Sequence, residues 1–295
     1  MKYKVIVPAS SANLGCGFDT LAIALNIYNT YIFSISNQQY EFINCNSQFN
    51  NKDNLVYISF LKTLKYLNKK IKGIKIEFDC KIPLSGGLGS SSCCIIAGIY
   101  GAYLITNTKI NTKDILNLAL TIENHSDNLT ASIYGGLIAT CNINNKLVHT
   151  NYNIDHRFSF LIIYPNYTIS TKKSRQLLPN TIPFKDAIEN ISRLSIILKA
   201  FETYQKDLLT ITMGDKLHEP YRKELIHEYH QVKNICHKID SIYFYISGSG
   251  ATLVNIINDT SNIDKINKEL SKLNYKWQTI LLNVDNKGTR YYNVK

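Results

Sequence analysis

The pattern of hydrophobic and polar positions predicts a chain in which strands and helices are mixed. Residues 74–79 alternate between apolar and polar side chains, and this period of two is typical of a strand. Residues 21–36 are also strand-like. Short apolar segments predict further strands at residues 4–7, 158–164, 243–247, 253–257 and 278–284. Pro8 is expected to end the first of these strands.

Helices are predicted where apolar residues recur at helical spacing. The helix expected over residues 55–67 should bury the face that carries Leu55, Ile58, Leu61 and Leu64. A second helix is expected over residues 112–123, with Thr112 as its N-cap. Further helices are predicted at residues 184–207, 208–218 and 263–273.

A loop rich in glycine and serine precedes a long apolar segment in residues 81–105. Gly86, Gly87 and Gly89 allow tight turns and let the backbone approach a ligand closely. A helix that opens on Ser90 directs free N–H groups and the positive end of its dipole at the loop, which favours an anion such as a polyphosphate. A serine N-cap after a glycine turn is the simpler interpretation, but the density of glycine and serine favours the anion site. No Lys-Ser or Lys-Thr follows the last glycine, so this is not a Walker loop.

Length and composition narrow the class of protein. At 295 residues the chain can bury a good core and forms two domains or one large one. With 45% hydrophobic and 19% charged residues, it is not a disordered protein. No apolar run is long enough to span a bilayer, and the apolar block near Met1 is too short for a secretion signal. Seven cysteines without a Cys-x-x-Cys pair favour reduced thiols in the cytoplasm. We expect three of them to be packing residues: Cys16, Cys93 and Cys94.

The formal net charge of +11 raises the question of a nucleic-acid partner. Lysine is spread through the sequence in ones and twos, and no arginine-rich or aromatic-interleaved stripe accompanies it. Because asparagine, isoleucine, lysine and tyrosine are abundant together, we interpret the charge as a compositional bias that also helps to attract an anionic nucleotide. No nucleic-acid partner and no membrane association are predicted.

Residues 83–92, Pro-Leu-Ser-Gly-Gly-Leu-Gly-Ser-Ser-Ser, closely resemble the phosphate-binding signature of the GHMP kinases. This superfamily includes galactokinase, homoserine kinase, mevalonate kinase and phosphomevalonate kinase. Ser92 stands where the family usually has alanine, which is a small-for-small change. The resemblance implies that the loop binds ATP through Pro83, Leu84, Ser85, Gly86, Gly87, Leu88, Gly89, Ser90, Ser91, Ser92 and Cys93.

A second resemblance lies just after the first predicted strand. Residues 9–19 form a loop of small residues in which Asn13 and Asp19 can hold an amine or a hydroxyl group. Such a loop could also be an ordinary turn between strands. It resembles the first GHMP motif in the form found in homoserine kinases, and this implies that Asn13 and Asp19 contact an amino acid substrate.

The polar cluster of residues 123–128, Glu-Asn-His-Ser-Asp-Asn, resembles the Glu-Gly-His-Pro-Asp-Asn segment of homoserine kinases. On its own such a cluster could merely cap a helix and face solvent. The resemblance implies that Glu123 binds magnesium together with Ser90, and that His125 and Asn128 line the substrate pocket. One carboxylate is chemically sufficient because Mg²⁺ takes its other ligands from phosphate and water.

Three further substrate residues are implied in the second half of the chain. Thr171 and Arg175 match pocket positions of homoserine kinases, although Arg175 alone could equally be a solvated arginine. Residues 215–222 resemble the family's Asp-x-x-x-Glu-Pro-x-Arg element, in which Arg222 meets the substrate carboxylate. Arg175 and Arg222 would then clamp that carboxylate. Residues 248–252, Gly-Ser-Gly-Ala-Thr, resemble the third GHMP motif, which supports the phosphate site.

The resemblance extends over essentially the whole chain and implies an α+β fold with two domains. Residues 1–155 would form an ATP-binding domain like the second domain of ribosomal protein S5, and residues 156–295 a ferredoxin-like domain. The implied activity is the phosphorylation of L-homoserine with ATP and Mg²⁺ in the cytoplasm, and a homodimer is an open possibility. Another GHMP kinase, such as a mevalonate kinase, remains an alternative, and an inactive RNA-binding protein is a more distant one.

Catalytic roles follow from what phosphoryl transfer requires. Its transition state is loose and carries charge on the phosphate oxygens, so positioning and charge stabilisation dominate. The resemblance implies direct roles for Glu123, Ser91 and Asn128. Asn128 stands where mevalonate kinase has an aspartate proposed as base, and we therefore predict no strong general base.

Overall fold

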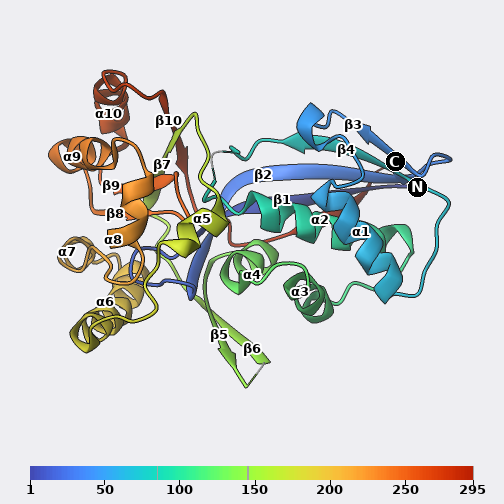
Figure 1. Ribbon diagram of the computed structural model, residues 1–295, viewed down its shortest axis with the longest axis horizontal. Coiled ribbons are helices and arrows are strands. Elements are labelled where there is room, and N and C mark those ends of the chain that lie inside the picture. The colour runs from blue at the N-terminus through green and yellow to red at the C-terminus, as the bar shows by residue number, and fades with distance from the viewer. Residues whose placement is uncertain (85, 145, 295) are drawn as a thin grey trace.

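The computed structural model describes residues 1–84, 86–144 and 146–294. Ser85, which the sequence assigns to the ATP site, lies outside the described residues. Within them the chain folds into two lobes, one built on a seven-stranded sheet and the other on a four-stranded sheet (Figure 1). The mixed α+β architecture expected from the sequence is present.

The first sheet has the strand order β11-β1-β2-β4-β3, and β5 pairs with β2 and with β6. Its strands are β1 (Lys2–Ala12), β2 (Leu21–Ile35), β3 (Tyr40–Ile43), β4 (Ile74–Cys80), β5 (Leu137–Ile143), β6 (Lys146–Tyr152) and β11 (Arg290–Val294). All pairs are antiparallel except that of β3 with β4. The helices of this lobe are α1 (Leu55–Tyr66), α2 (Ser90–Ile105), α3 (Thr112–Leu120) and α4 (Ser126–Tyr134), with a 3₁₀ turn at Ser47–Phe49.

The second sheet is antiparallel and has the strand order β10-β7-β9-β8. Its strands are β7 (Ser159–Pro165), β8 (Tyr243–Ile246), β9 (Leu253–Ile257) and β10 (Trp277–Leu282). Its helices are α5 (Thr171–Gln176), α6 (Phe184–Thr203), α7 (Lys206–Ile211), α8 (Glu219–Arg222), α9 (Tyr229–Ile239) and α10 (Ile263–Leu270), with 3₁₀ turns at Lys223–Leu225 and Thr260–Asn262. Helices between β7 and β8 and between β9 and β10 give the strand–helix–strand–strand–helix–strand order of a ferredoxin-like fold.

Strand β1 is longer than the sequence predicted. It continues past Pro8 to Ala12, with an irregular register between Pro8 and Ala9. The pairing of β1 with β11 ends at Ile6, so the missing N–H of Pro8 leaves no bond unmade on that side. The prediction that Pro8 ends the strand was therefore wrong.

The buried face of α1 also differs from the prediction. Leu64 of the predicted face is buried, and Leu55 and Ile58 are partly buried, but Leu61 is 42% exposed. Val56 and Phe60 pack in the core as well. Apolar residues lie on several sides of this helix, so their spacing alone did not determine which stripe faces the sheet.

The helix α3 begins at Thr112, where the predicted range began, but its N-cap and its end differ from the prediction. The side chain of Asn111 accepts hydrogen bonds from two N–H groups of the first turn, so Asn111, and not Thr112, is the N-cap. The helix ends at Leu120, which places Glu123 in the turn that follows.

The long helices predicted over residues 184–218 are interrupted. Helix α6 ends at Thr203 because Tyr204 adopts a left-handed conformation with a φ of 56°. A short helix α7 follows and ends at Ile211, and residues 212–218 form a loop. This loop leads into α8, which carries Arg222.

The C-terminal strand β11, which the sequence analysis did not predict, pairs with β1 and brings the two ends of the chain together (Figure 1). The proposed boundary between residues 155 and 156 falls between β6 of the first sheet and β7 of the second, but β11 lies after this boundary and belongs to the first sheet. The two lobes are joined by one hydrophobic cluster, which contains Val7 of β1, Ile96 of α2 and Tyr243 of β8. Buried side chains of both lobes therefore pack against one another at the junction.

Two expectations from composition can be checked against the described residues. No helix among them has the length and apolar character needed to cross a membrane. All seven cysteines are free thiols; Cys16 and Cys93 are buried and Cys94 is partly buried, as expected for packing residues.

Candidate active site

The glycine-rich loop lies at the N-terminus of α2, as predicted. The helix begins at Ser90, and Gly89 before it has a φ of 66°. Gly86 and Gly87 also have positive φ values, of 90° and 84°, in the region that favours glycine. A Cβ on Gly87 would lie 2.4 Å from the carbonyl oxygen of Ser247, so only glycine fits this close approach.

The segment around the third motif supports this loop from the other lobe. The hydroxyl groups of Ser247 and Thr252 donate hydrogen bonds to the carbonyl oxygens of Gly87 and Gly86. The same Ser247 hydroxyl lies 2.7 Å from the hydroxyl of Ser11 on β1. The expected contact between the third motif and the glycine-rich loop is therefore present.

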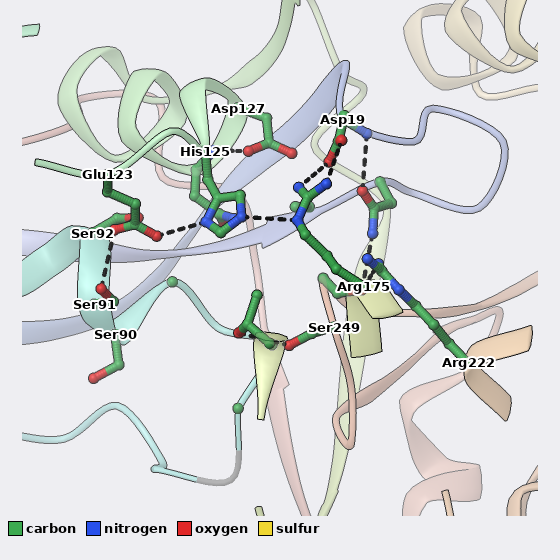
Figure 2. A pocket seen from close by; sticks show the side chains of 18 of the residues that line it. Asp19, Ser90, Ser91, Ser92, Glu123, His125, Asp127, Arg175, Arg222 and Ser249 are labelled. Carbon is green, nitrogen blue, oxygen red and sulfur yellow. Dashed lines mark hydrogen bonds and ion pairs between the residues drawn. The ribbon is translucent and has the colours of Figure 1, made fainter. Parts of the chain in front are cut away.

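A cavity of about 170 Å³ lies between the two lobes, in front of the N-terminus of α2 (Figure 2). Its lining includes every residue that the sequence assigned to the substrate: Asn13, Asp19, His125, Asn128, Thr171, Arg175 and Arg222. It also includes Glu123 and seven residues of the predicted ATP site: Leu84, Gly86, Gly87, Gly89, Ser90, Ser91 and Ser92. Two other predicted ATP residues, Leu88 and Cys93, are buried in the core, and Pro83 does not line the cavity either.

Glu123 contacts both the serines of α2 and His125 (Figure 2). Its Oε2 accepts hydrogen bonds from Ser91 Oγ at 3.0 Å and Ser92 Oγ at 3.4 Å. Its Oε1 lies 2.8 Å from Nδ1 of His125, and this hydrogen bond raises the pKa of His125. The Ser90 hydroxyl points away from Glu123 in Figure 2. Ser91 and Ser92, and not Ser90, are thus the serines that contact the predicted magnesium ligand.

Arg175 connects His125 to Asp19 across the cavity. Its Nε donates to His125 Nε2 at 3.2 Å, and its two terminal nitrogens donate to the Asp19 carboxylate at 2.9 and 2.7 Å. Because Nε2 of His125 accepts, its Nδ1 carries the proton that is donated to Glu123. The hydrogen bonds with Asp19 raise the pKa of Arg175. A chain of contacts therefore runs from Asp19 to the N-terminus of α2.

Arg222 reaches the same cavity from α8. It is 3% exposed, and its Nη1 donates to the carbonyl oxygen of Gly248 at 2.7 Å. Its Nε has no partner among the described residues. Burial, and then the nearby Arg175, lower the pKa of Arg222 to about 10, so the guanidinium is still charged at neutral pH. A buried cation with donors left over is suited to bind a carboxylate.

Comparison with known proteins decides the family. Residues 54–136 match the model of the GHMP kinases N terminal domain. A homoserine kinase from Clostridium botulinum (strain Alaska E43 / Type E3) is 37% identical over 288 residues, which is 97% of each chain. One from Clostridium botulinum (strain 657 / Type Ba4) is 33% identical over 294 residues, 99% of each chain. The chain belongs to the homoserine kinase family of the GHMP kinases.

Solved structures agree with this assignment. The crystal structure of homoserine kinase from Cytophaga hutchinsonii has a TM-score of 0.85 to this chain at 25% identity, and the match covers 99% of this chain and 97% of that one. The mevalonate kinase from Methanococcus jannaschii shares the fold, with a TM-score of 0.71 at 19% identity over 96% of this chain and 98% of that one. The GHMP kinase fold expected from the sequence is thereby confirmed.

Asp127 is a cavity residue to which the sequence analysis gave no role. It is 4% exposed, and its Oδ1 accepts a hydrogen bond from the backbone N–H of Asn128 at 2.7 Å. Burial raises the pKa of Asp127 to about 6. The Asn128 side chain is held in turn by Ser10, whose hydroxyl donates to its Oδ1 at 2.8 Å. The signal in the sequence was the position of Asp127 inside the homoserine kinase segment.

A second cavity, of about 620 Å³, adjoins the first, and Leu84, Ser90 and Ser91 line both. The remaining walls come from β2, the segment between β3 and α1, the start of α1, β4 with the residues after it, and α2: Asn29, Tyr31, Asn44, Cys45, Asn46, Phe49, Asn54, Leu55, Val56, Phe78, Cys80, Ile82 and Cys94. Sequence reasoning missed this cavity because its walls are far apart in the chain and form no shared motif.

The residues around Glu123 fit the magnesium ion expected for this homoserine kinase family member. No group of three or more His, Cys, Asp or Glu side chains in the described part of the chain could hold a metal by itself. Glu123 and the hydroxyl groups beside it are hard oxygen donors at the N-terminus of α2, and Mg²⁺ commonly binds one or two carboxylates, phosphate oxygens and water. This donor set suits an ion that arrives with a polyphosphate.

Glu219 gives the folded protein a predictable dependence on pH. It is 6% exposed, its Oε1 accepts from the N–H of Ile246 at 2.7 Å, and burial raises its pKa from 4.5 to about 7. Between these values the folded state holds a proton that the unfolded state has lost, so the free energy of unfolding falls as pH rises through this range. Glu219→Gln keeps the acceptor and does not titrate.

We expect Glu219→Gln to be more stable than the parent at pH 8, by roughly 1–3 kcal/mol, and similar to it at pH 5. Urea unfolding of both proteins at the two pH values measures this. If the free energy of unfolding depends on pH equally in the parent and in Glu219→Gln, the pH dependence is not due to Glu219.

Proposed function

We propose that this chain transfers the γ-phosphoryl group of ATP to the hydroxyl group of L-homoserine and forms O-phospho-L-homoserine, a step in threonine biosynthesis. One observation carries the proposal: the 170 Å³ cavity is lined both by the glycine-rich loop and by all seven side chains expected to bind homoserine. Membership of the homoserine kinase family, at 33–37% identity over nearly the full length, supports the same acceptor.

Charge complementarity supports an amino acid as the acceptor. Asp19 and Arg175 bind each other, and their side chains are 45% and 38% exposed, so this pair contributes only about 0–1 kcal/mol to stability. Homoserine carries an ammonium and a carboxylate group, and it can replace this pair at small cost by binding Asp19 with one and Arg175 with the other. Arg222 would take the second carboxylate oxygen, with Asn13, His125 and Thr171 around the rest of the molecule.

Positioning accounts for the chemistry. The N–H groups that open α2 would hold the transferred phosphate, and Ser91 would keep Glu123 turned toward it. Mg²⁺, when bound at Glu123, supplies positive charge to the phosphate oxygens. Asn128 lies on the same cavity wall and would orient the homoserine hydroxyl group for in-line attack. Asp127 beside it can accept a proton above its pKa of about 6.

We assign the base and ribose of ATP to the 620 Å³ cavity, because it adjoins the glycine-rich loop and has largely apolar walls suited to an aromatic ring. Cys80, at the end of β4, lines this cavity and is exposed, so a larger side chain there should fill the cavity without disturbing the core. Cys80→Trp should raise KM for ATP at least about tenfold, or ~1.4 kcal/mol of binding. KM for homoserine should change less than about twofold.

The matched control is Cys141→Trp, because Cys141 is also exposed but lies on β5 and lines neither cavity. Steady-state kinetics with each substrate varied in turn make the measurement. Equal KM values for ATP in Cys80→Trp and Cys141→Trp would contradict the placement of the nucleoside in this cavity.

An assay of ADP release with a panel of acceptors tests the function itself. L-homoserine should support turnover, and mevalonate and L-serine should support far less. If mevalonate is turned over in preference to L-homoserine, the proposed acceptor is wrong, although the chain is still a kinase. Absence of ADP release with every acceptor, together with salt-sensitive RNA binding, would favour the inactive binding protein.

We further expect a cytoplasmic enzyme, since the seven cysteines are free thiols and such thiols suit a reducing compartment. A homodimer is the assembly that we would look for first, by size-exclusion chromatography with light scattering. No nucleic-acid partner is expected.

A further inference from the structure

The loop of residues 13–19, which carries two of the proposed acceptor ligands, has an unusual backbone. Asn13, Leu14 and Asp19 have positive φ values of 76°, 46° and 52°, and Gly15 has a φ of 74°. Positive φ in residues other than glycine costs free energy and persists only where the surroundings hold the backbone firmly. Hydrogen bonds within the loop supply part of this restraint, such as those to Asn13 from the N–H groups of Gly17 at 2.9 Å and Asp19 at 3.2 Å. Contacts from the elements that pack against the loop supply more.

Three buried side chains of the second half of the chain supply that restraint by donating to three successive carbonyl groups. The hydroxyl of Tyr243 donates to the carbonyl oxygen of Leu14 at 2.9 Å. Nε2 of His218 lies 2.9 Å from the carbonyl oxygen of Gly15. Nδ2 of Asn190 donates to the carbonyl oxygen of Cys16 at 2.7 Å. We call Asn190, His218 and Tyr243 the three donors.

The three donors come from different elements and are themselves fixed. Tyr243 and His218 have no exposed surface, and Asn190 is 3% exposed. Tyr243 lies on β8 and Asn190 on α6. Asn190 also accepts a hydrogen bond through its Oδ1 from the N–H of Lys216 at 3.0 Å, which ties it to the segment before α8. None of these side chains lines the cavity, so they act on the acceptor site only through the loop.

His218 is held in one orientation by its own segment. The Oδ2 of Asp215 accepts from the N–H groups of Leu217, His218 and Glu219 at 3.0, 2.6 and 2.8 Å and so caps the start of α8. A carbonyl oxygen can only accept, so Nε2 of His218 carries the proton toward Gly15. Burial lowers the pKa of His218, which favours the neutral ring.

His218 also places an aromatic ring beside the arginines. Its ring stacks on Phe18 with centroids 5.1 Å apart and an angle of 23° between the planes. The guanidinium carbons of Arg222 and Arg175 lie 5.0 and 5.8 Å from the centroid of Phe18. One histidine therefore contacts the loop twice, through Gly15 and through Phe18.

We propose that Asn190, His218 and Tyr243 are positioning residues for the acceptor substrate, because their hydrogen bonds to the carbonyl groups of Leu14, Gly15 and Cys16 hold Asn13 and Asp19 in place. The inference rests on the proposed function, in which Asn13 and Asp19 bind homoserine. It assigns to the second lobe the task of shaping a loop that belongs to the first.

Tyr243→Phe is the sharpest test, since it removes one hydroxyl group and leaves the carbonyl of Leu14 without that donor. KM for homoserine should rise about 5- to 30-fold, as expected for one buried group left unpaired, while KM for ATP changes less than about twofold. His218→Phe keeps a ring against Phe18 but loses the donor, and it should behave alike. His218→Gln restores an N–H near Nε2 and should recover most of the affinity for homoserine.

The matched control is Tyr100→Phe, because Tyr100 is a buried tyrosine on α2 whose hydroxyl interacts with Thr112, and it is not one of the three donors. It should lower the melting temperature and leave both KM values unchanged. If Tyr243→Phe behaves like this control, the three donors stabilise the fold only and the inference is overturned, although turnover of homoserine by the parent would still support the proposed function.

A readout without substrate separates the two proposals completely. Hydrogen exchange of the amides in residues 13–19 should become faster in Tyr243→Phe than in Tyr100→Phe. This holds whether or not the parent phosphorylates homoserine, so it tests the restraint even if the proposed function fails. Unchanged exchange in the loop would overturn the inference. Tyr243→Phe keeps the test available should His218→Phe fail to fold.

Discussion

Replacement of Glu123 by alanine is expected to lower kcat by about 10²- to 10³-fold, the usual effect of removing one group that stabilises transition-state charge. Glu123 is the carboxylate that Ser91 and Ser92 orient at the N-terminus of α2, and it is the proposed protein ligand of magnesium. The variant should also need more Mg²⁺ to reach half of its maximal rate. Initial rates at saturating ATP and homoserine, over a magnesium titration, measure both effects.

Asp114→Asn is the control for the loss of one negative charge, which Glu123→Ala also causes. Asp114 is an acidic residue in the first turn of α3 and lines neither cavity. Its kcat and its magnesium requirement should match those of the parent. A Glu123→Ala enzyme that keeps more than about one third of the parent kcat would show that the metal is held elsewhere, since ~0.7 kcal/mol or less of transition-state stabilisation would then come from Glu123.

Arg222→Ala should raise KM for homoserine by about 10- to 100-fold, because a hydrogen bond to a charged group contributes roughly 1.5–3 kcal/mol. The guanidinium is buried at the cavity wall. KM for ATP should change little. Arg222→Lys keeps the charge but loses the planar pair of donors, so its KM for homoserine should lie between those of the parent and the alanine variant.

Arg157→Ala provides the comparison for loss of a positive charge. Arg157 pairs with Asp155 on the surface and lines neither cavity. Both KM values should stay at the parent level. If Arg222→Ala binds homoserine as tightly as Arg157→Ala does, the carboxylate clamp is wrong.

The sequence predicted those parts of the site that depend on residues close together in the chain. Three glycines allow tight turns and a serine favours a helix start, and α2 begins at Ser90 as expected. The family resemblance assigned seven residues to the acceptor substrate, and all seven line one cavity although they come from both lobes.

The parts that the sequence missed depend on contacts between distant segments. Pro8 was predicted to end β1, but the consequence of its missing N–H depends on where β11 stops pairing, and that strand lies at the other end of the chain. Leu61 was wrongly assigned to the buried face of α1 because several sides of this helix are apolar. The three donors were invisible for the same reason, because a tyrosine on β8 gives no sign of the carbonyl that it meets.

A crystal structure with a non-hydrolysable ATP analogue, Mg²⁺ and L-homoserine would test the central claim most directly. We predict the γ-phosphate at the N-terminus of α2 beside Glu123, the base in the cavity that contains Cys80, and the homoserine hydroxyl group facing the phosphate from between Asp19 and Arg222. Nucleotide bound elsewhere, with the glycine-rich loop free of phosphate, would contradict it.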